Sequence, residues 1–199
     1  AISSALNRRL TLIQGPPGTG KTTTATHLLQ HLALQDRGPL LATAESNVAV
    51  DNLLEGLLDL GVKALRIGRP VKVRENLRSA TLDAVLEHHP MQEELAFLRD
   101  EQRELRKALP SLKGKEKGLM HRDIKINQKE IRRMEDVMTA SVLDDAEVIC
   151  ATTIGCGHRL LELRKFPIVL MDEATQATEP SAFVPVSYTH LTLPTTRYV

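Results

Sequence analysis

The stretch GPPGTGKT, residues 15–22, decides how the rest of this 199-residue sequence is interpreted. It satisfies the pattern G-x-x-x-x-G-K-[ST], and it lies between the apolar run at residues 10–13 and a segment with helical apolar spacing at residues 21–35. Glycines in such a turn let backbone N–H groups converge on phosphate oxygens. A strand, this turn and a helix, in that order, predict a phosphate-binding loop, although a plain glycine turn before a helix is the simpler alternative.

The chemistry of the loop assigns a role to its charged and hydroxyl residues. Lys21 is expected to reach the β- and γ-phosphates of a nucleotide, and the Thr22 hydroxyl is expected to ligate Mg²⁺. ATP is the expected nucleotide, because the guanine-reading pattern [NT]-K-x-D and the transporter signature LSGGQ are both absent from the sequence. The predicted nucleotide-binding residues are Gly15, Pro16, Pro17, Gly18, Thr19, Gly20, Lys21, Thr22 and Thr23.

A second acidic motif, VLMDEAT, begins at residue 169 and ends an apolar run in two carboxylates. Asp172 is expected to hold Mg²⁺, and Glu173 to polarise the attacking water as a general base. An acidic pair in a solvated loop is the alternative when the motif is taken alone. The phosphate loop upstream favours the catalytic interpretation.

The order of apolar segments predicts the fold class. Strands are expected at residues 10–13, 40–44, 64–67, 147–151 and 167–171, and helices at 21–35 and 48–60. Because strands and helices alternate, we expect right-handed βαβ units and a parallel sheet, which is an α/β architecture of the P-loop NTPase class with a RecA-like sheet.

A charged segment interrupts this alternation. Residues 91–141 hold 22 charged side chains among 51 positions, whereas the other 148 positions hold 29. Two stripes repeat at intervals of three and four, one at residues 95–109 and one at residues 120–138. They predict an inserted hairpin of two antiparallel helices joined along a narrow apolar seam, with the insertion at about residues 88–143.

Composition excludes several classes of protein. The net charge of +1 gives no electrostatic reason to expect nucleic-acid or membrane binding, and no run of 18 apolar residues exists. Cys150 and Cys156 are too few for a disulfide framework or a four-ligand zinc site, even with His158 nearby. We expect both cysteines to be reduced and buried in an intracellular protein.

Two polar loops leave their function open. Ser46 and Asn47 either cap the helix that follows or bind a nucleic-acid phosphate at its start. Thr152 and Thr153 end a strand in hydroxyls and either form an ordinary turn or contact a nucleic-acid backbone.

Four blocks in one order, LIQGPPGTGKT, SNVAVDNL, VICATTIGCG and VLMDEATQATEP, resemble the superfamily 1 helicases of the up-frameshift (nonsense-mediated decay) type, whose relatives include the immunoglobulin mu-binding and senataxin-like helicases. The resemblance covers residues 1 to about 185. It implies a RecA-like first motor lobe that hydrolyses ATP while moving 5′ to 3′ on single-stranded RNA or DNA, in the cytoplasm or the nucleus. It also implies that Ser46, Asn47, Thr152 and Thr153 contact the sugar-phosphate backbone, and that the hairpin is the helical insertion beside the nucleic-acid channel.

The resemblance also indicates what to expect beyond this chain. The adenine-reading glutamine, one strand of the sheet and a second lobe with catalytic arginines would lie outside the 199 residues, so we expect the chain alone not to unwind nucleic acid. Glu45 stands where the family usually has proline, and a carboxylate turned toward a phosphate path would repel it.

Two other functions compete with the helicase. A non-hydrolysing P-loop interaction switch draws its support from Glu45. An AAA-type ATPase fits GPPGTGKT, but it fits neither SNVAVDNL nor the long interval between Lys21 and Asp172.

Both ends of the chain call for separate treatment. The sequence begins at Ala1 without methionine, and we expect a natural N-terminal part to precede it. Residues 186–199 resemble the translation of a transposase sequencing adapter, so we exclude this tail from fold reasoning. A natural threonine-rich tail is the alternative.

Overall fold

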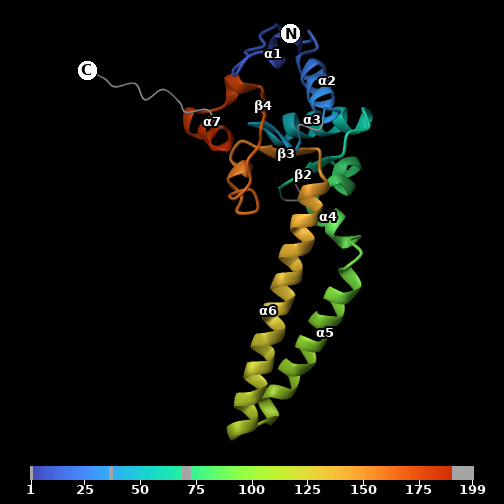
Figure 1. Ribbon diagram of the computed structural model, residues 1–199, viewed down its shortest axis with the longest axis vertical. Helices are drawn as coiled ribbons and strands as arrows, with labels where there is room; N and C mark the ends of the chain where they lie inside the picture. Colours follow the sequence, from blue (N-terminus) through green and yellow to red (C-terminus); the bar gives the residue numbers. More distant parts are fainter. Residues whose placement is uncertain (1, 36–37, 69–72, 190–199) are drawn as a thin grey trace, which may run out of the picture. The chain divides into compact units, whose positions relative to one another are not determined.

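The computed structural model describes residues 2–35, 38–68 and 73–189 (Figure 1). The chain divides into two compact units. One unit combines the residues up to Leu82 with those from Asp144 onward, and the other consists of residues 83–143. The predicted nucleotide-binding and nucleic-acid-binding residues all belong to the first unit.

The first unit contains a parallel sheet of four strands in the order β2-β3-β1-β4. The strands are β1 (Leu40–Ala44), β2 (Ala64–Arg66), β3 (Val148–Thr152) and β4 (Val169–Asp172). Each begins within two residues of the start predicted from the sequence. The α/β fold with a parallel sheet is therefore confirmed.

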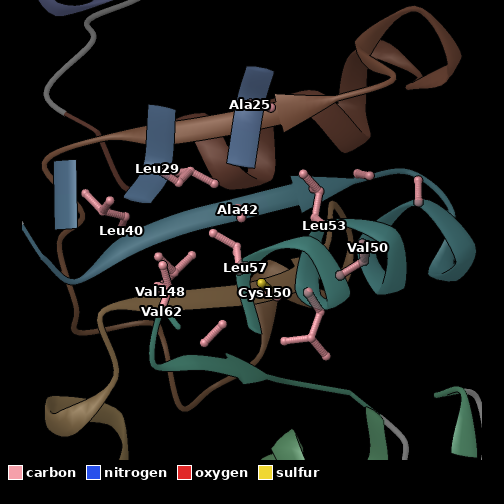
Figure 2. Close-up of a cluster of buried hydrophobic side chains, with 14 of the residues drawn as sticks. Ala25, Leu29, Leu40, Ala42, Val50, Leu53, Leu57, Val62, Val148 and Cys150 are labelled. Carbon is pink, nitrogen blue, oxygen red and sulfur yellow. The ribbon is translucent and has the colours of Figure 1, made fainter. Parts of the chain in front are cut away.

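Two helices cover the apolar core of this sheet. Helix α2 (Lys21–Ala33) and helix α3 (Asn47–Asp59) contribute to one cluster of buried side chains. Leu29 of α2 and Leu57 of α3 are fully buried in it, together with residues of β1 and β3 (Figure 2). Helix α3 begins one residue before its predicted start, because Ser46 Oγ caps it by accepting a hydrogen bond from the Ala49 backbone N–H at 3.0 Å.

The prediction of a strand at residues 10–13 is wrong. The structure forms no strand there, and Leu10 and Leu12 are 67% and 85% exposed. A strand needs a neighbour for its backbone hydrogen bonds. Residues 10–13 pair with neither of the two edge strands, β2 or β4, so their backbone lacks the hydrogen bonds of a sheet.

The second unit is a helical hairpin. Helix α5 (Gln92–Ala108) and helix α6 (Gly114–Asp145) run side by side in Figure 1. Leu95 packs with three residues of the α6 stripe, and the seam residue Asn127 donates from Nδ2 to Glu101 Oε2 at 2.9 Å. Between the helices, Arg99 pairs with Glu135 at 2.8 Å. The three buried partners of Leu95 are Ile131, Met134 and Met138.

Short elements complete the chain. They are α1 (Ile2–Leu6), α4 (Leu82–Glu87), α7 (Glu179–Val186) and the 3-10 helices η2 (Glu75–Ala80), η3 (Leu109–Ser111), η4 (Gly155–Gly157) and η5 (Ala174–Gln176). Among the residues that the structure describes, each helix is too short or too polar to span a bilayer.

Tyr188, in the segment after α7, packs within the first unit. Tyr188 Oη donates to the Cys156 carbonyl at 2.7 Å, and its ring meets Phe166 edge to face, with the centroids 5.8 Å apart. The rest of the adapter-like tail, residues 190–199, lies outside the described residues. The origin of residues 186–199 stays a prediction.

Both cysteines are free, buried thiols. Cys150 lies on β3, and Cys156 lies in η4, where its Sγ donates to Thr43 Oγ1 at 3.6 Å. Burial raises the pKa of Cys150 to about 12 and the pKa of Cys156 to about 11. Since the thiolate is the reactive form, folding suppresses the reactivity of both side chains.

We therefore expect the folded chain at pH 8 to react with a disulfide reagent such as Ellman's reagent far more slowly than the chain unfolded in guanidinium, which should release two equivalents of chromophore at once. Because the folded pKa of each thiol lies above its unfolded value, the stability that they contribute is present below pH ~9 and is lost as the pH rises through 11 to 12. Rapid titration of both thiols in the folded chain would contradict this assignment.

Candidate functional site

The register of the parallel sheet brings the predicted site residues to one edge. Ala44, the last residue of β1, is level with Thr152 of β3 on one side and with Asp172 of β4 on the other. Ser46 and Asn47 follow β1 directly, and Lys21 opens helix α2. The residues that end or follow the strands lie at the carboxyl edge of the sheet, which is where parallel α/β sheets bind ligands. A hydrogen bond from Thr22 to Asp172 brings the start of α2 to the same edge.

The phosphate loop has the backbone that its glycines predict. Gly18 and Gly20 adopt φ values of 76° and 78°, in the left-handed region that disfavours side chains. Gly20 is the N-cap of α2 and has no side chain with which to cap the first N–H groups of the helix. These N–H groups are thus open to an anion, and the helix dipole adds partial positive charge at the same point.

Lys21 lies over this loop. Its Nζ donates to the carbonyls of Gly15 and Pro16, both at 2.8 Å. An ammonium group carries three hydrogens, so one donor remains for a phosphate oxygen while two hold the side chain in place. The Thr19 hydroxyl donates to the Pro16 carbonyl at 2.8 Å and further fixes the turn.

The loop meets the second acidic motif through one hydrogen bond. Thr22 Oγ1 donates to Asp172 Oδ2 at 2.8 Å, although 150 positions separate the two residues. The other oxygen of Asp172 accepts from the Glu173 backbone N–H at 2.9 Å. Both oxygens of the carboxylate are therefore oriented, one of them toward the phosphate loop.

Glu173 follows with an unusual backbone. Its φ is 50°, the one positive value at a non-glycine position among the described residues. A non-glycine residue held in this region costs about 1–3 kcal/mol and is found mainly at functional sites. The Glu173 side chain is exposed at the carboxyl edge, where a water molecule can reach it.

The donor set fits a metal-bound nucleotide. A hydroxyl oxygen and a carboxylate oxygen within 2.8 Å of each other are hard ligands of the kind that Mg²⁺ prefers. The ammonium of Lys21 and the uncapped N–H groups of α2 supply the donors that a polyphosphate requires. The predicted nucleotide-binding residues 15–23 thus lie beside the predicted metal ligands.

The two polar loops share a pattern of hydrogen bonding. Ser46 Oγ accepts from the Ala49 N–H, Thr152 Oγ1 accepts from the Gly155 N–H at 3.1 Å, and Asn47 Oδ1 accepts from Arg66 Nη2 at 3.0 Å. In each case an oxygen is engaged as an acceptor inside the protein. The hydroxyl hydrogens of Ser46 and Thr152 and the amide hydrogens of Asn47 remain as donors.

Thr153 differs from these three residues. It is fully buried, and its hydroxyl donates to Glu45 Oε2 at 2.6 Å. The same carboxylate oxygen accepts from Ser181 Oγ of α7 at 2.9 Å. The single hydroxyl hydrogen of Thr153 is therefore used within the protein, and the contact with a nucleic acid predicted for this residue stays a prediction.

Sequence reasoning missed two residues of this edge. The sequence did not show where the Glu45 carboxylate points, and in the structure it joins the loop after β3 to α7. Arg66, on β2, was read only as part of an apolar strand, yet its buried side chain contacts Asn47. A charged residue within the run ALRI was the signal that could have identified it.

Comparisons with known proteins agree with these observations. The sequence profile of the family described as an AAA domain matches residues 1–193. The ATP-dependent helicase NAM7 of Saccharomyces cerevisiae is 39% identical over 186 residues, which cover 94% of this chain and 18% of that protein. The DNA-binding protein SMUBP-2 of Mus musculus is 35% identical over 192 residues, which cover 94% of this chain and 19% of that protein.

A more distant relative is archaeal. The uncharacterized ATP-dependent helicase MJ0104 of Methanocaldococcus jannaschii is 31% identical over 221 residues, which cover 92% of this chain and 33% of that protein. The chain thus spans between 18% and 33% of the length of these three relatives.

Proposed function

This chain belongs to the AAA domain family, among the superfamily 1 helicases of the up-frameshift type. We propose that it is the first motor lobe of an ATP-dependent helicase that moves 5′ to 3′ along single-stranded RNA or DNA. Relatives that match 92% or more of the chain are named as ATP-dependent helicases. Their names and the geometry of the site support the same activity.

One observation carries this proposal, namely the hydrogen bond of 2.8 Å between Thr22 Oγ1 and Asp172 Oδ2. It joins the phosphate loop to the acidic motif, so one Mg²⁺–ATP complex can contact both. Thr22 and Asp172 would hold Mg²⁺, which neutralises charge on the β- and γ-phosphates when bound. Lys21 and the N–H groups at the start of α2 would hold the phosphate oxygens.

Glu173 would act as the general base. Its exposed carboxylate would accept a proton from a water molecule as the water oxygen attacks the γ-phosphorus and ADP departs. The φ of 50° gives the Glu173 side chain a direction different from the one that an extended continuation of β4 would give. The backbone strain is therefore consistent with a requirement for position at this residue.

The donors at the two polar loops support a nucleic-acid contact at the same edge. Ser46, Asn47 and Thr152 would donate hydrogen bonds to phosphate oxygens, because the acceptor oxygen of each is already engaged inside the protein. Contacts of this kind fix the register of a strand without reading its sequence. They suit a motor that moves along any single-stranded nucleic acid.

The rival function, a non-hydrolysing interaction switch, loses its support. It rested on Glu45 as a carboxylate that would repel a nucleic acid. In the structure, Glu45 accepts hydrogen bonds from Thr153 and Ser181 and so has a structural task. We also propose an intracellular location, in the cytoplasm or the nucleus, with the two free, buried thiols as its support.

The change Glu173→Gln in the full-length parent protein tests the hydrolysis step. We expect ATP binding to persist and the turnover number to fall about 10²- to 10⁴-fold, since the amide cannot accept the proton of water. The measurements are steady-state phosphate release and equilibrium binding of a fluorescent ATP analogue. Glu162→Gln, which changes another exposed carboxylate of the same unit, is the matched control. Unchanged turnover in Glu173→Gln would exclude Glu173 as the base.

The change Thr152→Val tests the nucleic-acid contact. Valine keeps the shape of threonine but removes the hydroxyl donor, and a lost hydrogen bond to a charged group corresponds to roughly a tenfold weaker interaction. We expect that increase in the dissociation constant for a labelled single-stranded oligonucleotide, measured by fluorescence anisotropy at fixed salt. Thr152→Ser, which keeps the hydroxyl, should bind like the unchanged protein. Equal losses in both variants would show that the hydroxyl is not the contact.

A further inference from the structure

The buried side chain of Arg66 connects β2 to the start of helix α3. Arg66 is 1% exposed, and its Nε lies 3.4 Å from Asp51 Oδ1 of α3. Its Nη2 donates to Asn47 Oδ1 at 3.0 Å, and its Nη1 donates to the Ile67 carbonyl. The guanidinium group thus has three different acceptors, of which two belong to α3.

The surroundings hold this guanidinium group in one place. The second oxygen of Asp51 accepts from the Arg74 backbone N–H at 3.1 Å, so the carboxylate is itself anchored. Gly68 has a φ of 145°, and a Cβ on it would lie 3.1 Å from Arg66 Nη1. A glycine at this position therefore leaves the space that the guanidinium group occupies.

A fixed guanidinium group determines the orientation of the Asn47 amide. Arginine nitrogens can only donate hydrogen bonds, so the amide must turn its oxygen toward Nη2 and its Nδ2 away from it. Within residues 2–35, 38–68 and 73–189, no hydrogen bond from Asn47 Nδ2 is formed. Asn47 is partly exposed, at the carboxyl edge of the sheet. Its two amide hydrogens are therefore available to a ligand.

We propose that Arg66 is a positioning residue for nucleic-acid binding, which orients the Asn47 amide so that Nδ2 donates to a phosphate oxygen of the strand. This inference rests on the proposed function, and it adds a residue that lies too deep to touch the nucleic acid. Without Arg66, the amide can rotate by half a turn and present its oxygen, which repels a phosphate.

The experiment must distinguish this positioning role of Arg66 from a purely structural role. Removal of one partner of the buried ion pair between Arg66 and Asp51 leaves the other charge buried and unpaired, which strongly destabilises the fold whatever Arg66 does in binding. Loss of binding in a single Arg66 variant is therefore ambiguous. The distinction requires a variant that folds and that still lacks the donor to Asn47.

The experiment uses the full-length parent protein and a double-mutant cycle. Arg66→Met with Asp51→Leu replaces the ion pair by apolar side chains, an exchange that is often neutral for stability. The second variant of the cycle is Asn47→Ala. The third variant combines Arg66→Met, Asp51→Leu and Asn47→Ala. Arg66→Lys is an additional variant, since it keeps a cation beside Asp51 but lacks the second nitrogen of the guanidinium fork. Folding of each variant is checked by its thermal unfolding midpoint.

We expect each of the three single steps, namely the ion-pair exchange, Asn47→Ala and Arg66→Lys, to raise the dissociation constant for a single-stranded oligonucleotide about fivefold to tenfold. The combined variant should bind no more weakly than Asn47→Ala alone, because the steps remove one and the same contact. Additive losses would overturn the positioning role, as would unchanged affinity in the ion-pair exchange or in Arg66→Lys.

Failure of the proposed function would give a result different from failure of the inference about Arg66. If the unchanged parent protein bound no single-stranded nucleic acid, the proposed function itself would fall. If the parent bound it and Asn47→Ala bound equally well, only the role of Asn47, and the inference about Arg66 with it, would fall.

Discussion

The site depends on the register of β1 within a parallel sheet. Because Ala44 is level with both Thr152 and Asp172, the ends of three strands meet at one edge. A shift of one residue in either pairing would turn every side chain of that strand to the opposite face. Every residue of β1 and the first four residues of β3 are buried, so such a shift would disrupt the packing of side chains on both faces of the sheet. The hydrogen bond between Thr22 and Asp172 is available only because this register holds.

The sequence predicted those features that depend on local chemistry. The phosphate loop, the start of α3 at Ser46 and the helices of the hairpin follow from glycine, capping and apolar spacing within short windows. Features that depend on a distant partner were not predictable. The apolar run at residues 10–13 reads as a strand, but strand formation requires a neighbour to pair with. Glu45 reads as a repulsive charge, yet Thr153 and Ser181, 108 and 136 positions away, turn its carboxylate inward.

The near-zero net charge does not argue against an anionic ligand. With a formal charge of +1, the chain has no general attraction for polyphosphates. Attraction for an anion comes instead from the direction of individual hydrogen bonds at the edge of the sheet. Oxygens of Ser46, Asn47 and Thr152 accept from within the protein, so the atoms left for a ligand are donors. An edge of this kind favours anions through its local arrangement, and its selectivity does not require a basic surface.

Two features that cost folding free energy, a strained backbone and a buried charge, occur at this edge or in contact with it, where the site is proposed. Glu173 adopts a backbone conformation that disfavours its side chain, and Arg66 places a charge where an apolar residue would avoid desolvation. Neither arrangement improves stability compared with simpler alternatives, so the core of α2, α3 and the sheet must offset both. The two costly positions lie at the carboxyl edge of the sheet or contact a residue there. Since strain and buried charge persist where geometry matters more than stability, their concentration at this edge is independent support for locating the function there.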